Sequence, residues 1–213
     1  MGFWDVASII GIVVVLAAGW WAYPHLPPRV PTHWNFRGEV DGYSSRFAAT
    51  FVFPLVMLGL AVLFQVLPKI DPRGKNYAKF SDTYWLIVNG ILIFCGLVQA
   101  LVLANGLGAP VSMGRILPIG VGFLMMVIGN ILGRLRPNWF VGIRTPWTLS
   151  SDEVWTKTHR LGGRLFVAGG FLLMLSALLP GALGLPTVIV IIVVLVLIPV
   201  LYSLYLWMRE RST

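Results

Sequence analysis

The chain has 213 residues, of which 57% are hydrophobic and only 11% are charged, against about 25% charged in a typical soluble domain. Together with a mean hydropathy of +0.83, this composition excludes an ordinary soluble protein and indicates an integral membrane protein. The net charge of +8 would suggest a nucleic-acid partner in a soluble chain. A positive-inside bias explains it here, so we expect no direct nucleic-acid binding.

Six apolar segments are long enough to span a bilayer, because a spanning helix needs about 20 apolar residues. Backbone groups in lipid must be hydrogen-bonded internally, and the segments lack the alternation of barrel strands, which favours helices. We therefore predict an all-α integral membrane protein forming a single membrane domain, 1–213. The expected spans are 3–23, 47–67, 84–104, 111–132, 164–180 and 183–207.

The basic residues predict the orientation. The first apolar run has no preceding Lys or Arg and no small-x-small cleavage pattern, so we expect a retained helix rather than a cleaved signal peptide. Of the 16 Lys and Arg residues, twelve fall in the loops 68–82 and 133–163, at the adjoining start of the fifth span, and in the C-terminal tail. The positive-inside rule then predicts cytoplasmic N- and C-termini, two inner loops at 68–82 and 133–163, and an outer loop at 24–46.

The outer loop combines prolines, aromatic residues and both charges. Four prolines between residues 24 and 31 predict an extended first half. Gly38 and the Asp41-Gly42 pair predict turns. The loop is either a recognition surface for something outside the cell or a set of polar residues near lipid headgroups, and its His and acid spacing matches no standard metal site. The recognition candidates are His33, Trp34, Asn35, Gly38, Asp41, Gly42 and Tyr43.

The inner loop 133–163 predicts a short helix. Ser150 and Glu153 have the spacing of a capping box, so we expect a helix to begin near residue 151. Trp155 and His159 are four residues apart and share a face. The pattern predicts an amphipathic helix over 151–161 lying at the inner membrane interface, followed by a bend at Gly162-Gly163 into the fifth span. The tryptophans would act as interfacial anchors, Arg144 as a phosphate or helix C-terminus contact, and His159 as a hydrogen-bonded interfacial side chain.

Four polar side chains are expected within spans: Gln65, Asn89, Gln99 and Asn130. Gln65, Asn89 and Asn130 fall near the cytoplasmic ends of the second, third and fourth spans, at the level of Arg144 and His159. Such amides either tie helices together or line a polar cavity that opens to the cytoplasm and is closed by the inner loop. No Asp, Glu, Lys or Arg lies in the middle of a span, which argues against an ion-coupled transporter.

The sequence gives little sign of catalysis. It has no HExxH, GxSxG or phosphate-binding glycine loop. His159 has Asp152 and Glu153 nearby but no evident nucleophile. We therefore predict no enzyme activity, no catalytic residue, no metal and no cofactor, while a metal-dependent membrane enzyme using the histidines stays open as a weaker alternative.

Two stretches resemble a known family. The run "NWFVGIRTPWTLSSDEVWTKTHRLGGRLFVAGG" resembles the signature of the SdpI-like membrane proteins. The pattern P-x-H-W-N-x-x-G-x-x-D-G-Y in the outer loop is similar to the uncharacterised domain that commonly precedes this signature. The best motif candidates in the inner loop are Asn138, Gly142, Arg144, Thr145, Pro146, Trp147, Trp155 and His159.

The resemblance implies a multi-pass protein of the bacterial plasma membrane. The founding member protects cells from a secreted membrane-active peptide toxin and holds a small DNA-binding repressor at the membrane. We therefore expect a membrane immunity and signalling protein whose partners are membrane lipids, an extracellular peptide toxin and a cytosolic repressor. The alternative is a transporter or binding protein for a lipid or small molecule, with a polar cavity facing the cytoplasm.

Overall fold

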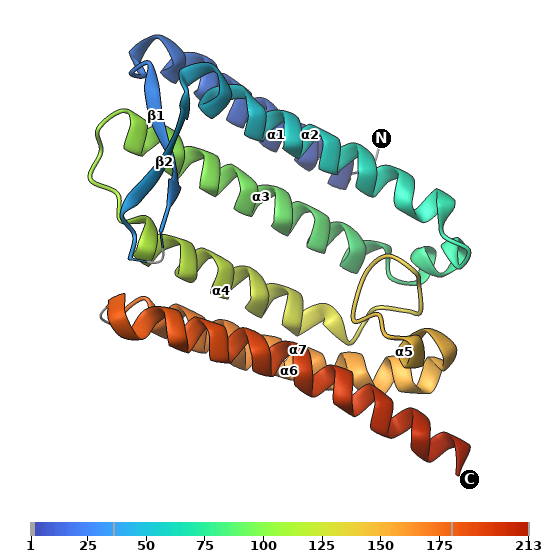
Figure 1. Ribbon diagram of the computed structural model, residues 1–213. Helices are drawn as coiled ribbons and strands as arrows, with labels where there is room; N and C mark the ends of the chain where they lie inside the picture. Colours follow the sequence, from blue (N-terminus) through green and yellow to red (C-terminus); the bar gives the residue numbers. More distant parts are fainter. Residues whose placement is uncertain (1–2, 36, 180, 213) are drawn as a thin grey trace.

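Six long helices lie side by side along one common direction in the computed structural model, which describes residues 3–35, 37–179 and 181–212 (Figure 1). Both termini lie at one end of the bundle, which we call the base, and a β-hairpin lies at the other end. The elements are α1 (Phe3–Ala22), η1 (Tyr23–His25), β1 (Arg29–Trp34), β2 (Val40–Ser45), α2 (Arg46–Ile70), η2 (Gly74–Lys79), α3 (Ser81–Gly106), α4 (Met113–Leu132), α5 (Pro146–Ser150), α6 (Asp152–Ser176) and α7 (Gly181–Arg211).

Five of the long helices are apolar and long enough to cross a membrane, counted over the described residues. They are α1, α2, α3, α4 and α7. Helix α6 falls outside this group because its first three turns carry five charged residues from Asp152 to Arg164. The expected fifth span, 164–180, lies in α6 as far as Ser176, and its last residue lies outside the described part of the chain.

Helix α6 is continuous, so the expectation of a separate short helix over 151–161 is wrong. The predicted bend at Gly162-Gly163 is absent because both glycines are buried in contacts with neighbouring segments. A Cβ atom on Gly163 would lie 2.6 Å from the carbonyl oxygen of Gly129 in α4, and one on Gly162 would overlap the side chain of Ile143. These glycines therefore allow close packing of a straight helix rather than a change of direction.

The outer loop adds a two-stranded antiparallel hairpin to the all-α architecture that we expected. The turn lies at Gly38, where φ is +79°, and the Asn35 side-chain oxygen accepts the N–H groups of Arg37 (2.8 Å) and Glu39 (3.1 Å). The Asp41-Gly42 pair does not form a turn, contrary to expectation. Gly42 lies in β2 opposite His33, and a Cβ there would come within 2.8 Å of the His33 Cβ.

The hairpin covers one end of the bundle. Figure 1 shows it lying across the ends of α1, α2, α3 and α4, and β1 packs against both α2 and α3. Val30 in β1 is fully buried and belongs to a core cluster with Leu26, Leu103 and Met113. The burial of β-branched and aliphatic side chains fixes the hairpin to the bundle, because each such side chain contributes about 1.5–3 kcal/mol when fully buried.

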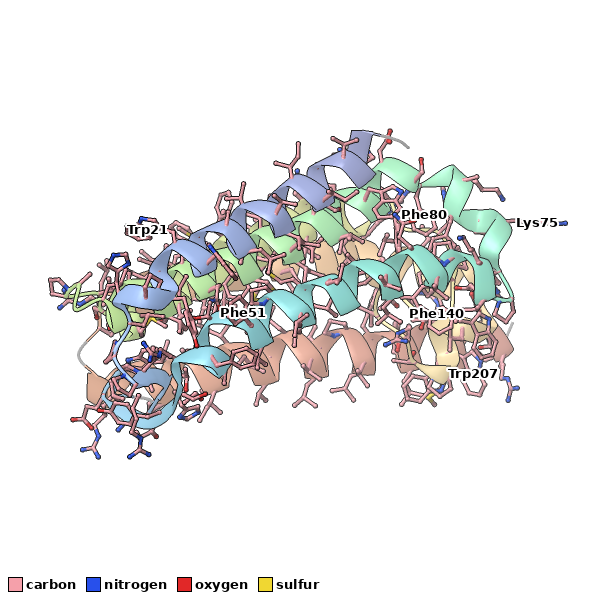
Figure 2. All side chains as sticks on the ribbon, turned by 90° about the horizontal axis from the view of Figure 1, so that it is seen from above. Trp21, Phe51, Lys75, Phe80, Phe140 and Trp207 are labelled. Atoms are coloured by element: carbon pink, nitrogen blue, oxygen red, sulfur yellow. The ribbon has the colours of Figure 1, made fainter. Side chains whose placement is uncertain are left out.

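A second core cluster holds the base together. It contains Tyr77, Phe80 and Tyr84 from one segment of the chain and Trp155 from another, in α6. Seen from above, Phe80 lies at the same end of the molecule as Trp207, far from Trp21 near the hairpin (Figure 2). The aromatic side chains at the base therefore pack together in a core rather than acting only as isolated membrane anchors.

The most extensive contact between helices in the described residues joins α4 and α6. Gly122 of α4 faces Gly170 of α6, and one heptad away Gly129 faces Gly163, with each glycine against the partner's backbone carbonyl. Helices in membranes approach closely where small residues face each other, since packing and weak C–H···O contacts replace the hydrophobic effect there. These four glycines thus form the closest backbone contact between the two helices.

Substituting Gly170 with Ala should destabilise the protein by about 1–3 kcal/mol, the usual cost of overpacking. Its Cβ would overlap the Gly122 carbonyl oxygen. The matched control is Gly59→Ala in α2, where a Cβ meets nothing within 4 Å and helix propensity favours Ala. The measurement is the thermal unfolding midpoint in detergent, and equal midpoints for the two variants would contradict the proposed contact.

Candidate functional site

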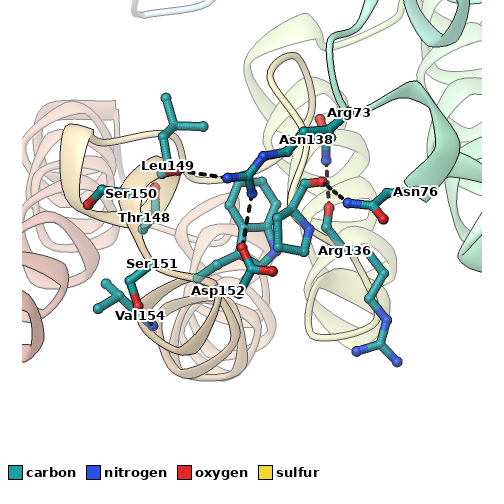
Figure 3. Close-up of polar contacts among 12 residues, drawn as sticks. Arg73, Asn76, Arg136, Asn138, Thr148, Leu149, Ser150, Ser151, Asp152 and Val154 are labelled. Atoms are coloured by element: carbon teal, nitrogen blue, oxygen red, sulfur yellow. Dashed lines mark hydrogen bonds and ion pairs between the residues drawn. The ribbon is translucent and has the colours of Figure 1, made fainter.

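The loop joining α4 to α6, residues 133–151, contains most of the inner motif and is organised around Asn138. This side chain is fully buried. Its oxygen accepts the N–H groups of Phe140 (3.0 Å) and Val141 (2.7 Å). Its amide nitrogen donates to the Val141 carbonyl (2.9 Å) and to the Arg136 carbonyl (2.9 Å), the second of which is drawn in Figure 3. Because buried backbone groups need partners, Asn138 allows the chain to turn sharply without regular secondary structure.

A buried carboxylate, Asp71, joins this loop to the turn between α2 and α3. One oxygen accepts the Tyr77 hydroxyl (3.0 Å) and the Trp139 N–H (2.9 Å), and the other accepts the Arg73 N–H (2.7 Å). Burial, followed by the Asp71 hydrogen bond and charge, raises the pKa of the Tyr77 hydroxyl. The sequence reasoning missed Asp71, although an acid directly before a proline at the end of an apolar run was a usable signal.

Two further contacts fasten the same segments together. Arg73 donates to the Asp152 carboxylate (3.0 Å) and to the Leu149 carbonyl (3.2 Å), and Asn76 donates to the Pro137 carbonyl (2.8 Å), as Figure 3 shows. Asp152 is 73% exposed, so this ion pair contributes at most about 1 kcal/mol. Its main effect is positional, because it fixes the start of α6 relative to α2.

Trp155 and His159 are buried beneath the loop, contrary to the expectation that they face the membrane interface. Their rings stack with centroids 4.0 Å apart, and the Trp155 indole donates to the Leu135 carbonyl (3.1 Å). His159 Nε2 accepts the Ile143 N–H (2.9 Å), so the ring proton is assigned to Nδ1, which donates to the Trp155 carbonyl (2.8 Å). The loop folds over this face of α6 because His159 supplies an acceptor for its backbone.

Gly142 allows the loop backbone to approach His159 closely enough for this hydrogen bond. Its φ of +121° lies in a region that L side chains rarely adopt. A Cβ at this position would also overlap Nε2 of His159. Gly142 and His159, which are 17 residues apart in the motif, are therefore two halves of one contact.

A capping box is present in this loop, although not where we expected one. Thr145 caps α5: its hydroxyl accepts the Thr148 N–H, and the Thr148 hydroxyl accepts the Thr145 N–H. Pro146 occupies the first turn of this helix. The Thr145 hydroxyl also lies 3.1 Å from the hydroxyl of Ser203 in α7. The predicted box of Ser150 and Glu153 is wrong. Ser151 caps α6 by accepting the Val154 N–H (3.2 Å), and Glu153 pairs instead with Lys157, one turn along the exposed face.

Only part of the inner motif is accessible to a partner. Arg144 and Pro146 are exposed, Trp147 is half-buried, and the neighbouring Trp139 is 49% exposed. Arg144 donates to the Trp139 carbonyl (3.0 Å), which holds the guanidinium at the backbone of Trp139, whose side chain is exposed. We call these two exposed side chains the Arg144 surface.

The intramembrane amides do not converge on one cavity with Arg144 and His159. Asn89 accepts from Ser8 of α1 (3.1 Å) and donates to the Trp85 carbonyl (3.0 Å), so it ties α1 to α3. Asn130 lines a separate groove between α4 and α6. Gln65 is exposed on α2, and His159 is enclosed by the loop. The arrangement supports the helix-tying interpretation for Asn89 and does not favour the single cytoplasm-facing cavity.

The outer motif builds the hairpin. His33 pairs with Asp41 across the strands (2.5 Å), and Asn35 donates to the Glu39 carboxylate (2.8 Å). Trp34 is half-buried against the core under the hairpin, whereas Tyr43 is 54% exposed. His33, Asp41 and Tyr43 are among the exposed residues of the hairpin. In the described residues no group of three or more His, Cys, Asp or Glu lies close enough to hold a metal ion.

The burial of His159 predicts a pH dependence of stability. Desolvation lowers its pKa from 6.5 to about 4. The unfolded chain therefore binds a proton more readily, and stability that is complete above pH 6.5 is lost as the pH falls toward 4. Linkage gives a loss of about 2 kcal/mol between pH 7.5 and pH 5. Thermal unfolding at both values should show this loss, and His159→Gln, which keeps an acceptor but does not titrate in this range, should reduce it.

Asp71→Ala should destabilise the base by about 2–4 kcal/mol, because three donors lose a charged, buried acceptor. The matched control is Asp82→Ala, an exposed carboxylate in the first turn of α3 with a single long contact to Trp4 (3.5 Å). Limited proteolysis of the loop 133–151 should become faster in Asp71→Ala only. Equal proteolysis of both variants would count against the role of Asp71 in joining the segments.

Comparisons with known proteins bear on both motifs. Residues 134–204 match the SdpI/YfhL protein family, and residues 10–58 match a domain of unknown function (DUF1648). The chain is 29% identical over 199 residues to the immunity protein SdpI of Bacillus subtilis (strain 168), covering 93% of this chain and 91% of that protein. No solved structure gives a significant match.

The first match covers the loop from residue 134, α6 and most of α7. The second covers α1 from residue 10, the hairpin and the first half of α2. Both regions that carried the resemblance in the sequence are thus found again by comparison, and in the same order. With its apolar helices long enough to span a membrane, this chain is a multi-pass membrane protein that is similar to the SdpI-like proteins in both regions.

Proposed function

We propose that this protein confers immunity on a bacterial cell against a secreted, membrane-active peptide toxin, and that it does so without catalysis. The observation that carries the proposal is the similarity to an immunity protein over 93% of the chain. The similarity extends over nearly all helices of the bundle. It therefore favours a role that the two whole proteins share over a similarity limited to one domain.

We infer an orientation with the base in the cytoplasm and the hairpin outside. Twelve of the 16 Lys and Arg residues belong to segments at or near the base, which supports this orientation through the positive-inside rule. Six helices between termini that lie at one end of the bundle are consistent with it (Figure 1). The membrane that receives the protein is then the bacterial plasma membrane, with lipid around the exposed aliphatic side chains of α2 and α7.

The exposed face of the hairpin is the proposed site of contact with the peptide. His33 and Tyr43 belong to adjacent strands of a hairpin that packs against α2 and α3, and Tyr43 is 54% exposed. Exposed aromatic side chains on a rigid support bind peptides with little loss of conformational entropy. The His33–Asp41 pair adds polar groups beside this aromatic ring.

The Arg144 surface is the proposed contact with a cytosolic repressor. An exposed indole next to a guanidinium is a common combination in protein interfaces, and the loop that carries both is fixed by Asp71, Asn138 and His159. The two proposed functions therefore lie at opposite ends of the molecule, which makes them separable by mutation.

Immunity is tested by expressing the chain in a toxin-sensitive bacterium that lacks its own immunity protein. The intact chain should restore growth in the presence of toxin. The double substitution His33→Ala and Tyr43→Ala should return survival toward that of cells without the protein, while leaving its amount in the membrane unchanged. Unchanged killing with or without the intact chain would overturn the proposal for that toxin.

Recruitment of the repressor to the membrane is measured in a separate experiment, which follows the localisation of a fluorescent repressor while the cells are exposed to toxin. Trp139→Ala with Arg144→Ala should abolish recruitment and leave survival intact. The matched control is Lys75→Ala, an exposed cation at the same end of the molecule (Figure 2). If Lys75→Ala had the same effect, general charge at the base and not the Arg144 surface would be responsible.

A further inference from the structure

A groove of about 460 Å³ lies between α4 and α6, beside the glycine contact and toward the base. Gly129, Gly133 and Gly163 line it, together with Asn130, Arg160 and Arg164. The groove exists because the glycines bring the two helices together without filling the space next to their backbones. The longer polar side chains of Asn130, Arg160 and Arg164 lie at the edges of the groove, and all three are exposed.

The polar groups of the groove are not used by the protein itself. The acids at the start of α6 are engaged elsewhere, since Asp152 pairs with Arg73 and Glu153 with Lys157. Among the described residues, the side chains of Asn130, Arg160 and Arg164 have no hydrogen-bond or ion-pair partner. Two guanidinium groups one helical turn apart therefore face the groove with their charges uncompensated.

The nearby end of α4 does not neutralise these arginines. Carbonyls in the last turn of a helix carry partial negative charge and attract cations. In α4 the Ile131 carbonyl accepts the Arg134 N–H (2.9 Å), and the Leu132 carbonyl accepts the Leu135 N–H (3.2 Å). These acceptors are satisfied within the backbone, so the donors of the groove are free for an external anion.

The lining changes from polar to apolar along α6. After Arg160 and Arg164, the groove is bounded by Val167 and Ala168, and the helix continues with exposed Phe171 and Leu172. Guanidinium and amide donors recognise the oxygens of a phosphate group, whereas the apolar part suits a glycerol backbone and acyl chains. We propose that this groove binds one acidic phospholipid, with its phosphate between Arg160, Arg164 and Asn130.

A phospholipid fits better than a free phosphate ion because only the lipid uses both parts of the groove. Each basic side chain near a membrane contributes about 1 kcal/mol to the attraction of anionic lipid, roughly fivefold in affinity, so two arginines give about 25-fold. The site differs from the cavity considered from the sequence, since neither Arg144 nor His159 lines it. It is independent of the immunity role.

The test uses the full chain, delipidated in detergent, with bound molecules counted by native mass spectrometry. Phosphatidylglycerol should bind with a stoichiometry of one and about 25-fold tighter than phosphatidylcholine. The double substitution Arg160→Gln and Arg164→Gln should remove this preference. Ala168→Trp, which keeps the charge but fills the apolar part, should lower the affinity for phosphatidylglycerol by about tenfold or more.

The matched control is Arg134→Gln with Arg136→Gln, which removes the same charge from exposed residues of the loop 133–151, outside the groove. This control should bind phosphatidylglycerol as the intact chain does. The thermal unfolding midpoint of each variant is measured as well, and only variants whose midpoint equals that of the intact chain are compared. A loss of binding in the control would overturn the site in favour of general charge attraction. Full displacement of the lipid by millimolar inorganic phosphate would also overturn it, because a free anion would then be the ligand.

Discussion

The close approach of α4 and α6 is the constraint on which the base of this molecule depends. Gly129 and Gly163 each pack against the other's backbone, with hypothetical Cβ distances of 2.7 and 2.6 Å to the facing carbonyl oxygens. Helices held at this separation leave no room between them for the chain that connects them. The loop 133–151 must therefore leave α4, turn over the outer face of α6 and return, and that path buries Trp155 and His159.

A loop on such a path needs side chains to satisfy its backbone, since it has little regular secondary structure. Three buried side chains do this work in different ways. Asn138 accepts N–H groups of its own loop, Asp71 of the neighbouring turn accepts the Trp139 N–H, and His159 of the helix below accepts the Ile143 N–H. Most of the inner motif is thus explained by the folding of one loop, because an unsatisfied buried backbone group costs about 1–3 kcal/mol.

The side chains of the hairpin and of the inner loop that remain exposed lie at the two ends of the bundle. The hairpin presents His33, Asp41 and Tyr43, and the base presents Trp139 and Arg144. A rigid bundle between two such surfaces suits a protein that meets one partner outside the membrane and another inside. The arginine-lined groove between α4 and α6 adds a third contact, with the lipid that surrounds the bundle.

The sequence by itself determined the class of the protein, the apolar helical segments, the uneven distribution of basic residues and the resemblance to a family. These features depend on composition, on apolar runs and on short motifs, all of which are local. Five of the expected segments coincide with helices apolar enough to span a membrane, because the length of an apolar run and the need for internal hydrogen bonds suffice to predict them.

Only the tertiary structure decided which residues of the motifs are structural. Gly162-Gly163 was a plausible bend until α4 and Ile143 were found packed against it. Trp155 and His159 had the spacing of an exposed amphipathic face until the loop was found to cover them. Asp71 has no neighbour in sequence that reveals its bond to Trp139, 68 residues away. In each case burial by a distant segment changed the environment, and periodicity within one helix carries no information about that segment.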